Sequence, residues 1–312
     1  MSSKVAFLFP GQGAQYVGMG KDLYSFVPNA KKTFDAADQI LGFSISKICF
    51  EGPEDVLTDT ANAQIAIFVT SIAVLKAVHS HLPNLTPQAV CGLSLGEFSA
   101  LVACNSLTFE DGVRLVRKRG ELMNAASTQN PGTMASILGL SIENCELICK
   151  ESGAQVANIN SPEQIVISGT QDAIARGCRL AQAKGGKAMP LKVSGAFHSR
   201  LMEPAQSGLS EALAKIQLKE PKTTFIPNVT GVPAQKSSEI QVFLGKQITQ
   251  SVQWVKTIHS LAQMGIAAAF EIGPGKVLKG LTKRNGAYFP VTCIETKKDI
   301  EQMVKMTEEK VC

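Results

Sequence analysis

The chain has 312 residues, of which 45% are hydrophobic and 18% are charged, and its formal net charge is +5. This balance is typical of a globular protein with one large core and room for a smaller domain, and it excludes a disordered or fibrous chain. The charge is mild, and the Lys and Arg residues are dispersed rather than interleaved with aromatic residues, which argues against a nucleic-acid partner.

Two further function classes are disfavoured by the sequence. No apolar stretch approaches the roughly 20 residues that a bilayer requires, and the N-terminus leads directly into an apolar run, so we expect neither a membrane span nor a targeting leader. The eight cysteines are scattered, without a C-x-x-C pair or a cysteine and histidine cluster at zinc spacing. We therefore expect no metal site and a reducing, cytoplasmic location.

Apolar runs and amphipathic segments alternate in the first part of the chain. The pattern predicts strands at 4–9 and 89–91, and helices at 28–41, 62–79, 95–104 and 109–126. Alternation returns after residue 200, with strands at 224–227, 267–272 and 290–294 and helices at 202–216, 239–248, 255–265 and after Gly275. This order is typical of a parallel sheet with helices on both faces.

The segment between these two parts has a different order of predicted strands and helices. It predicts strands at 133–140, 155–159, 164–168 and 188–193 and helices at 142–151 and 173–184. The resulting order β-α-β-β-α-β is the signature of a ferredoxin-like unit. We therefore predict an inserted subdomain at 128–196, within a core formed by 1–127 and 197–312.

Ser94 is the first candidate for chemistry. It lies in the pentad Gly92-Leu93-Ser94-Leu95-Gly96, between a predicted strand and a predicted helix. A G-x-S-x-G pentad in that place is a nucleophile elbow, in which the flanking glycines let the backbone turn sharply and expose the serine hydroxyl. Because glycine and serine also occur in ordinary turns, the pentad alone leaves a structural role open, with acyl transfer through a serine ester as the leading hypothesis.

His198 is the candidate base, because a serine hydroxyl needs a proton acceptor within hydrogen-bond reach. Of the four histidines, His79 and His81 lie at the polar end of a helix and His259 lies on an amphipathic segment, where structural roles are the simpler interpretation. His198 instead lies in a glycine-containing loop where the predicted insert rejoins the core, and such junctions commonly line a cleft. A capping or packing role in that loop remains the alternative.

Arg119 lies on the apolar side of its predicted helix. At about 100° per residue, Arg119 projects among Leu115, Val116, Leu122 and Met123, opposite the polar stripe of that helix. A buried guanidinium is costly unless it is paired. Arg119 is therefore predicted either to form an internal ion pair or to hold an anionic ligand.

The segment FPGQGAQ at 9–15 follows the first strand. It is not a dinucleotide fingerprint, because Tyr16 stands where the third glycine of G-x-G-x-x-G belongs. Serine hydrolases and transferases of this architecture place one oxyanion donor in such a loop and the other directly after the nucleophile. The backbone amides of Gln12 and Leu95 are thus the candidates for an oxyanion hole.

Taken together, these residues resemble the malonyl-CoA:acyl-carrier-protein transacylase family of fatty acid and polyketide synthesis. The resemblance covers nearly the whole chain, in order, through FPGQG at 9–13, GLSLGE at 92–97, Arg119-Gly120, NINSP at 158–162, GAFHS at 195–199, VQW at 252–254 and EIGPG at 271–275. It implies an α/β-hydrolase-like core with a ferredoxin-like insert, the organisation that the element order also predicts.

The resemblance also implies roles for single residues. Ser94 would carry the acyl group, His198 would be the general base, and Arg119 would bind the free malonyl carboxylate. The main-chain carbonyl of Gln247 would orient the imidazole, in place of the carboxylate of the familiar triads. Phe197 would narrow the acyl pocket toward a malonyl group rather than a methyl-branched one.

The expected reaction is ping-pong transfer of malonyl from malonyl-CoA to the phosphopantetheine thiol of acyl carrier protein, with no permanently bound cofactor. Carrier proteins are generally acidic, which suits a chain of charge +5. We expect a monomer that supplies extender units for fatty acid synthesis, since no synthase module is attached to the sequence.

The chain departs from the family pattern at two places. Leu93 replaces the usual histidine of the elbow, and the segment Gln250-Ser251-Val252 lacks the usual asparagine-proline pair, which bears on the placement of Gln247. Two other functions stay open: a serine esterase or thioesterase, which usually carries an acid between the serine and a late histidine, and a non-catalytic acyl-carrier-binding homologue.

Overall fold

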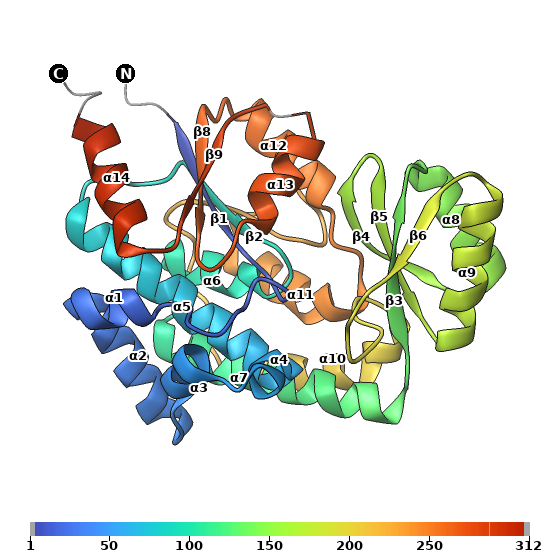
Figure 1. Ribbon diagram of the computed structural model, residues 1–312, viewed down its shortest axis with the longest axis horizontal. Coiled ribbons are helices and arrows are strands. Elements are labelled where there is room, and N and C mark those ends of the chain that lie inside the picture. Colours follow the sequence, from blue (N-terminus) through green and yellow to red (C-terminus); the bar gives the residue numbers. More distant parts are fainter. Residues whose placement is uncertain (1–3, 287, 309–312) are drawn as a thin grey trace.

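The computed structural model describes residues 4–286 and 288–308, and its larger part is built on one sheet (Figure 1). Its five strands are all parallel and lie in the order β7-β2-β1-β8-β9. They are β1 (Val5–Phe9), β2 (Ala89–Gly92), β7 (Thr224–Ile226), β8 (Ala268–Ile272) and β9 (Val291–Ile294). The predicted parallel sheet is confirmed, with each strand within a few residues of its expected place.

Helices cover both faces of this sheet, as the alternating pattern predicts. On β1, Phe7 and Phe9 point to one face and Ala6 and Leu8 to the other, and all four side chains are fully buried. On the first face, α5 (Thr60–His81) and α6 (Gly96–Ala103) pack on the strands, and α2 (Pro28–Leu41) and α7 (Phe109–Gln129) pack on α5 in a further layer. The second face packs against α12 (Trp254–Gln263) and α13 (Val277–Arg284).

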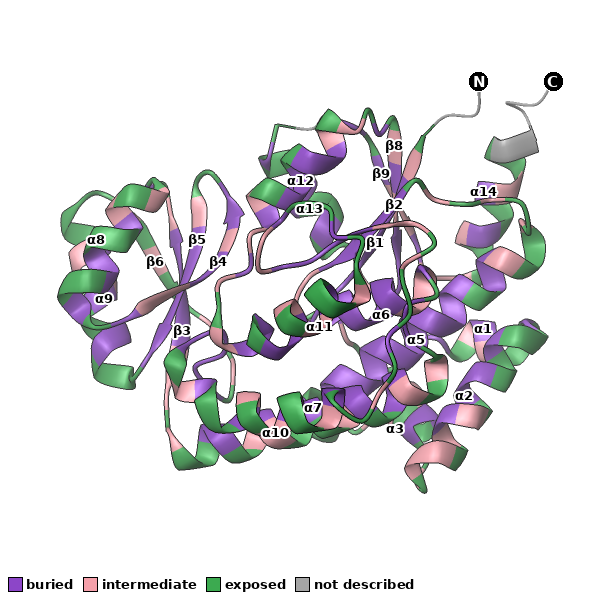
Figure 2. Cartoon of the chain, turned by 180° about the vertical axis from the view of Figure 1, so that it is seen from behind, coloured by how far each residue is buried: buried purple, intermediate pink, exposed green. Residues whose placement is uncertain are grey.

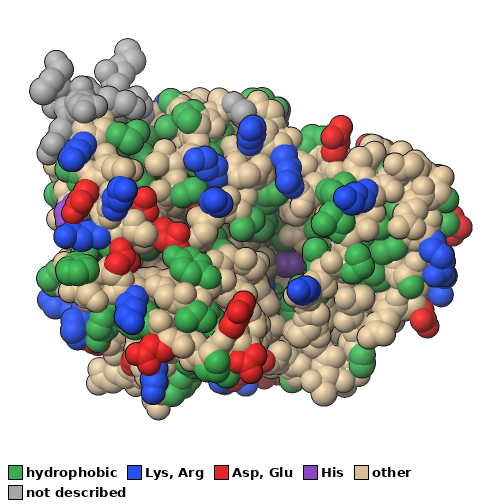
Figure 3. Space-filling view, viewed as in Figure 1, with side chains coloured by type: hydrophobic (Ala, Val, Ile, Leu, Met, Phe, Trp, Pro, Cys, Tyr) green, Lys and Arg blue, Asp and Glu red, His purple; other side chains and the backbone are tan. Residues whose placement is uncertain are grey.

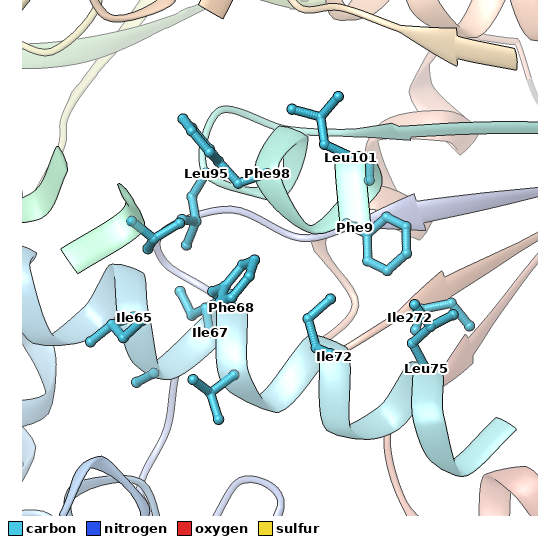
Figure 4. Packing of buried hydrophobic residues seen from close by; sticks show 14 of the residues in the cluster. Phe9, Ile65, Ile67, Phe68, Ile72, Leu75, Leu95, Phe98, Leu101 and Ile272 are labelled. Carbon is cyan, nitrogen blue, oxygen red and sulfur yellow. The ribbon is translucent and has the colours of Figure 1, made fainter. Parts of the chain in front are cut away.

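Helix α5 is the centre of the larger core. Figure 4 shows Ile72 and Leu75 of α5 lying beneath Phe9 and Ile272, the residues that end two neighbouring strands, and Phe68 of α5 lying beneath Leu95 and Phe98. α5 is also long and apolar enough to cross a membrane by length and composition, which corrects the expectation that no stretch approaches that length. Because 89% of its most apolar window is buried within the protein, α5 has the surroundings of a core helix.

The second sheet is antiparallel, in the order β4-β5-β3-β6. Its strands are β3 (Thr133–Leu138), β4 (Gln155–Ser161), β5 (Gln164–Gly169) and β6 (Lys187–Pro190), and it carries α8 (Ile142–Ser152) and α9 (Gln171–Ala183). This is the predicted β-α-β-β-α-β unit, with its own apolar core between the sheet and the two helices. Figure 2 shows buried strands beneath the exposed outer faces of α8 and α9. The limits 128–196 stay a prediction.

The remaining elements complete the larger part of the molecule. The pattern analysis missed four helices, three of which are no longer than 7 residues: α1 (Lys21–Phe26), α3 (Ile45–Glu51), α4 (Glu54–Thr58) and α14 (Lys297–Glu308). The helices predicted at 202–216 and 239–248 are each a helix joined to a 3-10 turn: η1 (Arg200–Met202) with α10 (Glu203–Leu213), and α11 (Ser237–Lys246) with η2 (Gln247–Thr249).

Hydrogen bonds join the small sheet to the larger part of the molecule. The amide of Ile159 on β4 donates to the carbonyl of Val252 over 2.9 Å, and the amide of Val252 donates to the carbonyl of Ala157 over 2.9 Å. From α13's C-terminal cap, Asn285 Nδ2 donates to the carbonyl of Asn160 over 2.8 Å. These bonds hold β4 beside the segment after η2, so the two sheets form the walls of one cleft.

Candidate active site

The nucleophile elbow is formed as the pentad predicts. β2 ends at Gly92, α6 begins at Gly96, and Ser94 between them has a φ of 52°, in the left-handed region that non-glycine residues rarely adopt. A Cβ atom on Gly92 would lie 2.1 Å from the backbone of Gly96, and one on Gly96 would lie 2.1 Å from the carbonyl oxygen of Phe9. The turn is therefore possible only with glycine at both flanking positions.

The structure brings Ser94, His198 and Gln247 together. Ser94 Oγ lies 2.9 Å from His198 Nε2. On the other side of the ring, His198 Nδ1 lies 2.9 Å from the main-chain carbonyl oxygen of Gln247 and 3.1 Å from that of Gln250. Because carbonyl oxygens only accept, Nδ1 carries the ring proton, and the lone pair of Nε2 faces the serine hydroxyl.

The surroundings keep the His198 imidazole neutral. His198 is 4% exposed. Burial lowers the pKa of His198 to about 4, with a smaller contribution in the same direction from the positive charge of Arg119, against the opposing effect of the two carbonyl contacts. At neutral pH the ring is therefore able to accept a proton from Ser94.

Arg119 is buried, at 1% exposure, and it faces the serine from α7. Its Nη1 donates to Gln64 Oε1 over 2.5 Å, and its Nη2 donates to Ser94 Oγ and to Gln247 Oε1, each over 3.0 Å. All three acceptors are neutral. Among residues 4–286 and 288–308, Arg119 forms no ion pair, so the internal ion pair that the sequence left open is not present.

One N–H group of the Arg119 guanidinium is unused, and the Nη2 group beside it already donates within the site. Nε has no hydrogen-bond partner in the described chain. In a planar guanidinium, Nε and Nη2 present parallel N–H groups along the same edge, and Nη2 is the atom that contacts Ser94. Arg119 does not itself line the cleft, so an acyl group would reach this edge only alongside the serine hydroxyl.

The predicted oxyanion donors lie in segments that pack against each other. A Cβ on Gly11 would lie 2.3 Å from the carbonyl oxygen of Leu93, which places the loop after β1 directly against the elbow. The backbone amides of Gln12 and Leu95 make no hydrogen bond to any residue that the structure describes. The Gln12 side chain donates to Thr60 Oγ1 over 3.2 Å, which ties its loop to α5. Two unpaired amides are what an oxyanion hole requires.

A cleft of about 830 Å³ between the two sheets opens onto Ser94 and His198. Figure 3 shows this hollow between the larger and the smaller part of the molecule, with a histidine on its floor. Phe197, 6% exposed, lines it beside His198, and Leu93 lines it in place of the histidine that the resemblance leads one to expect. The cleft is large enough for a flexible thioester substrate.

Sequence reasoning missed three residues of the site. Asn228 Oδ1 accepts from the amide of Ser94 over 2.6 Å, and Asn228 Nδ2 donates to the carbonyl of Gly92 over 2.6 Å. Gln64 and Glu97 are fully buried beside Arg119 and Gln247. The available signal was polarity in an apolar setting: Gln64 lies within the apolar helix α5, and Glu97 lies within the apolar helix α6.

The fold is a parallel α/β sheet that brings together a serine elbow, a neutral histidine and a buried arginine without an ion pair to the described residues. This is the arrangement expected of an acyltransferase. The comparisons with known proteins agree. The acyl transferase domain family matches residues 6–300. The malonyl CoA-acyl carrier protein transacylase of Bacillus subtilis is 43% identical over 98% of this chain and 98% of its own length. The chain belongs to this family of malonyl CoA-acyl carrier protein transacylases.

Solved structures support the same assignment. The malonyl CoA-acyl carrier protein transacylase from Clostridium perfringens is 35% identical, with a TM-score of 0.94 over 99% of each chain. A malonyl-transacylase in complex with its type II PKS acyl-carrier protein is 34% identical, with a TM-score of 0.94 over 97% of this chain and 100% of that one. The fold and its inserted antiparallel sheet are thus those of the family.

Proposed function

We propose that this chain transfers the malonyl group of malonyl-CoA to the phosphopantetheine thiol of an acyl carrier protein through an ester on Ser94. The observation that carries the proposal is the position of Ser94 Oγ, 2.9 Å from a neutral imidazole and 3.0 Å from a guanidinium nitrogen whose contacts are all neutral. A base and an anion-binding group therefore meet at one hydroxyl.

In the first half-reaction, His198 Nε2 takes the proton of Ser94 as Oγ attacks the thioester carbonyl carbon. The carbonyl oxygen becomes an oxyanion, which the amides of Gln12 and Leu95 stabilise by roughly 3 kcal/mol for each donor. Collapse of the tetrahedral intermediate breaks the carbon–sulfur bond. The departing sulfur receives the proton from His198 and leaves as the CoA thiol.

The second half-reaction runs the same steps with the carrier thiol. His198 takes the thiol proton, the sulfur attacks the ester carbonyl, and Ser94 leaves as an alkoxide that recovers the proton from His198. The main-chain carbonyls of Gln247 and Gln250 hold the imidazole in one tautomer throughout.

Arg119 selects the acyl group. The carboxylate of a malonyl ester on Ser94 would accept from Nε and Nη2, the edge that already contacts Oγ. An acetyl group offers nothing to this edge, so Arg119 favours malonyl. Phe197 restricts the width of the acyl pocket from the neighbouring loop.

The proposal includes the remaining properties that the sequence led us to expect. The protein would act as a monomer without a permanently bound cofactor, on an acidic carrier protein, and would supply extender units for fatty acid synthesis. A cytoplasmic location fits the free cysteines found throughout the described chain, since thiols persist in a reducing compartment.

Intact-mass spectrometry after brief mixing with malonyl-CoA tests the proposal. We expect one added malonyl group on the protein, its loss when carrier protein is added, and no adduct on the Ser94→Ala variant. An adduct that persists in Ser94→Ala would contradict the assignment of the nucleophile. Rapid hydrolysis of malonyl-CoA without carrier protein would indicate a thioesterase, and the absence of any adduct on the unaltered protein would indicate a non-catalytic homologue.

A further inference from the structure

Glu97 is a buried carboxyl group that the proposed reaction does not use. It lies in the first turn of α6, three residues after Ser94, and is 0% exposed. Its Oε2 accepts from Gln247 Nε2 over 2.5 Å and from the backbone amide of Asn228 over 3.3 Å. Its Oε1 has no partner among the described residues. Burying a carboxyl group with half of its acceptors unused is costly, so packing alone does not explain it.

The contact with Glu97 settles how the Gln247 amide is turned. Gln247 Nε2 donates one hydrogen to Glu97 and the other to the carbonyl of Ser94, over 2.9 Å. Both acceptors lie on the nitrogen side, so Gln247 Oε1 faces Arg119 Nη2, at 3.0 Å. If the amide were reversed, its NH₂ group would face the guanidinium, and two donors would meet.

This arrangement tolerates protonation of Glu97. Burial raises the pKa of Glu97 to about 7, against the lowering effects of the Gln247 and Asn228 hydrogen bonds and of the positive charge of Arg119. A proton on the free Oε1 would leave Oε2 as an acceptor, so the contact with Gln247 persists in both states. The group acts through geometry, and no ion pair with Arg119 is needed.

We propose that Glu97 is a positioning residue for the choice of acyl donor: by accepting from Gln247 Nε2 it turns the Gln247 carbonyl oxygen toward Arg119 and holds the guanidinium edge beside Ser94. The inference rests on the roles proposed above for Ser94 and Arg119. It adds a residue that contacts neither substrate nor Arg119 by a hydrogen bond and yet sets malonyl selectivity.

The variant Glu97→Met tests this proposal, because methionine has a similar length but its thioether is only a weak acceptor. Gln247 Nε2 then keeps one of its two acceptors, the Ser94 carbonyl, and the Gln247 carbonyl oxygen is held toward Arg119 less firmly. We expect the ratio of kcat/KM for malonyl-CoA to that for acetyl-CoA to fall about tenfold, the size of effect that one hydrogen bond to a charged group produces. The fall should come from malonyl-CoA, with acetyl-CoA little changed.

A double-mutant cycle separates positioning from a structural effect. In an Arg119→Ala background, Glu97→Met should leave the donor ratio unchanged, because the group through which Glu97 acts is gone. An equal fall in the ratio with and without Arg119 would overturn the proposal, as would an unchanged ratio in the single variant. If Glu97→Met does not fold, Glu97→Asp serves in the same cycle, since its shorter carboxylate withdraws from Gln247 and should lower the ratio only when Arg119 is present.

Glu271 provides the matched control. It is also 0% exposed, and its carboxylate accepts from the amides of Leu278 and Lys279 at the start of α13. Glu271→Met should lower stability while keeping the donor ratio of the unaltered protein. An unaltered protein without any preference for malonyl would contradict the proposed function itself, a result distinct from a normal preference that Glu97→Met fails to change.

Discussion

His198 Nδ1 lies 2.9 Å from the main-chain carbonyl oxygen of Gln247, where the familiar serine triads place a carboxylate. A carbonyl orients the ring but carries no negative charge to stabilise an imidazolium. Burial, with a smaller contribution from the nearby Arg119, therefore lowers the pKa of His198 to about 4, although the carbonyl contacts act in the opposite direction. The site therefore holds a weak base that is neutral at rest near pH 7, and a weak base suits the proposed reaction, in which the ester must stay intact until a carrier thiol arrives.

The first prediction follows from this pKa and concerns the acidic limb of the pH–rate profile. A general base works when deprotonated, so kcat/KM should persist as pH falls below the ordinary histidine value of about 6.5. Half of it should be lost only near pH 4. Steady-state rates between pH 3.5 and 8 measure the limb, and the fluorescence of the buried Trp254 shows whether the protein is folded at each pH. A midpoint near 6.5 with folded protein would contradict the assigned environment of His198.

The second prediction concerns Arg119. Arg119→Ala should lower kcat/KM for malonyl-CoA by about 100-fold, because a bidentate, desolvated carboxylate contact is worth roughly 2 to 5 kcal/mol, and acetyl-CoA should become the better donor. Arg119→Lys keeps the charge but lacks the parallel N–H edge, so it should restore little of the preference. Parallel assays with both donors give the result, and unchanged selectivity in Arg119→Ala would rule out the carboxylate contact.

Arg119→Ala should also move the acid limb. The positive charge of Arg119 lowers the pKa of His198, and its removal should raise that pKa and shift the limb measured with acetyl-CoA to higher pH. The direction of the shift along the pH axis separates this effect from a general loss of structure, which would lower the rate at every pH. A limb that stays in place would show that burial alone sets the pKa of His198.

The third prediction concerns the elbow glycines. Gly96→Ala places a methyl group 2.1 Å from the carbonyl oxygen of Phe9, so the backbone must move, at a cost of about 1 to 3 kcal/mol, and Ser94 moves with it. We expect a lower melting temperature and loss of malonyl-enzyme formation. Gly280→Ala is the control, since nothing lies within 4 Å of its Cβ and alanine favours a helix by about 1 kcal/mol. Equal melting temperatures for the two variants would contradict the close packing of the elbow.

Much of this structure is predictable from local patterns. Residues 28–41 show helical periodicity along their whole length and form α2 with those bounds. The inward direction of Arg119 also follows from periodicity, because it depends only on the residues of its own helix. Short helices such as α3 and α4 are not predictable in this way, since helices of 7 and 5 residues gain their stability from tertiary packing.

The partners of the site residues depend on the fold and could not be predicted locally. Asn228 lies 134 positions from Ser94 and still binds its amide, and Gln64 lies 55 positions from Arg119. Neither has a sequence pattern around it. The expectation that no apolar stretch is long enough to span a membrane failed for a related reason. Gln64, Thr70 and Ser71 interrupt the apolar run of α5 in the sequence, but the helix as a whole stays apolar and these three side chains are buried among the packed helices.

The fourth prediction concerns Phe197, which lies beside His198 and lines the cleft. Its ring is 6% exposed and packs into the main core, so it limits the space next to the acyl group rather than contacting the thioester. Phe197→Ala should open that space and raise kcat/KM for methylmalonyl-CoA relative to malonyl-CoA, by up to about tenfold, since one methyl group is worth about 1 to 3 kcal/mol in an apolar pocket.

Phe197→Ala also removes a buried ring, at a cost of about 3 to 5 kcal/mol of stability, so its donor ratio must be read at a temperature where the protein is folded. Phe225→Ala is the matched control, because Phe225 on β7 is 0% exposed and does not line the cleft. It should lose similar stability while keeping the donor ratio. If both variants accept methylmalonyl-CoA equally well, loosened packing rather than the removed ring sets the width of the acyl pocket. Phe197 would then not be the residue that excludes the methyl branch.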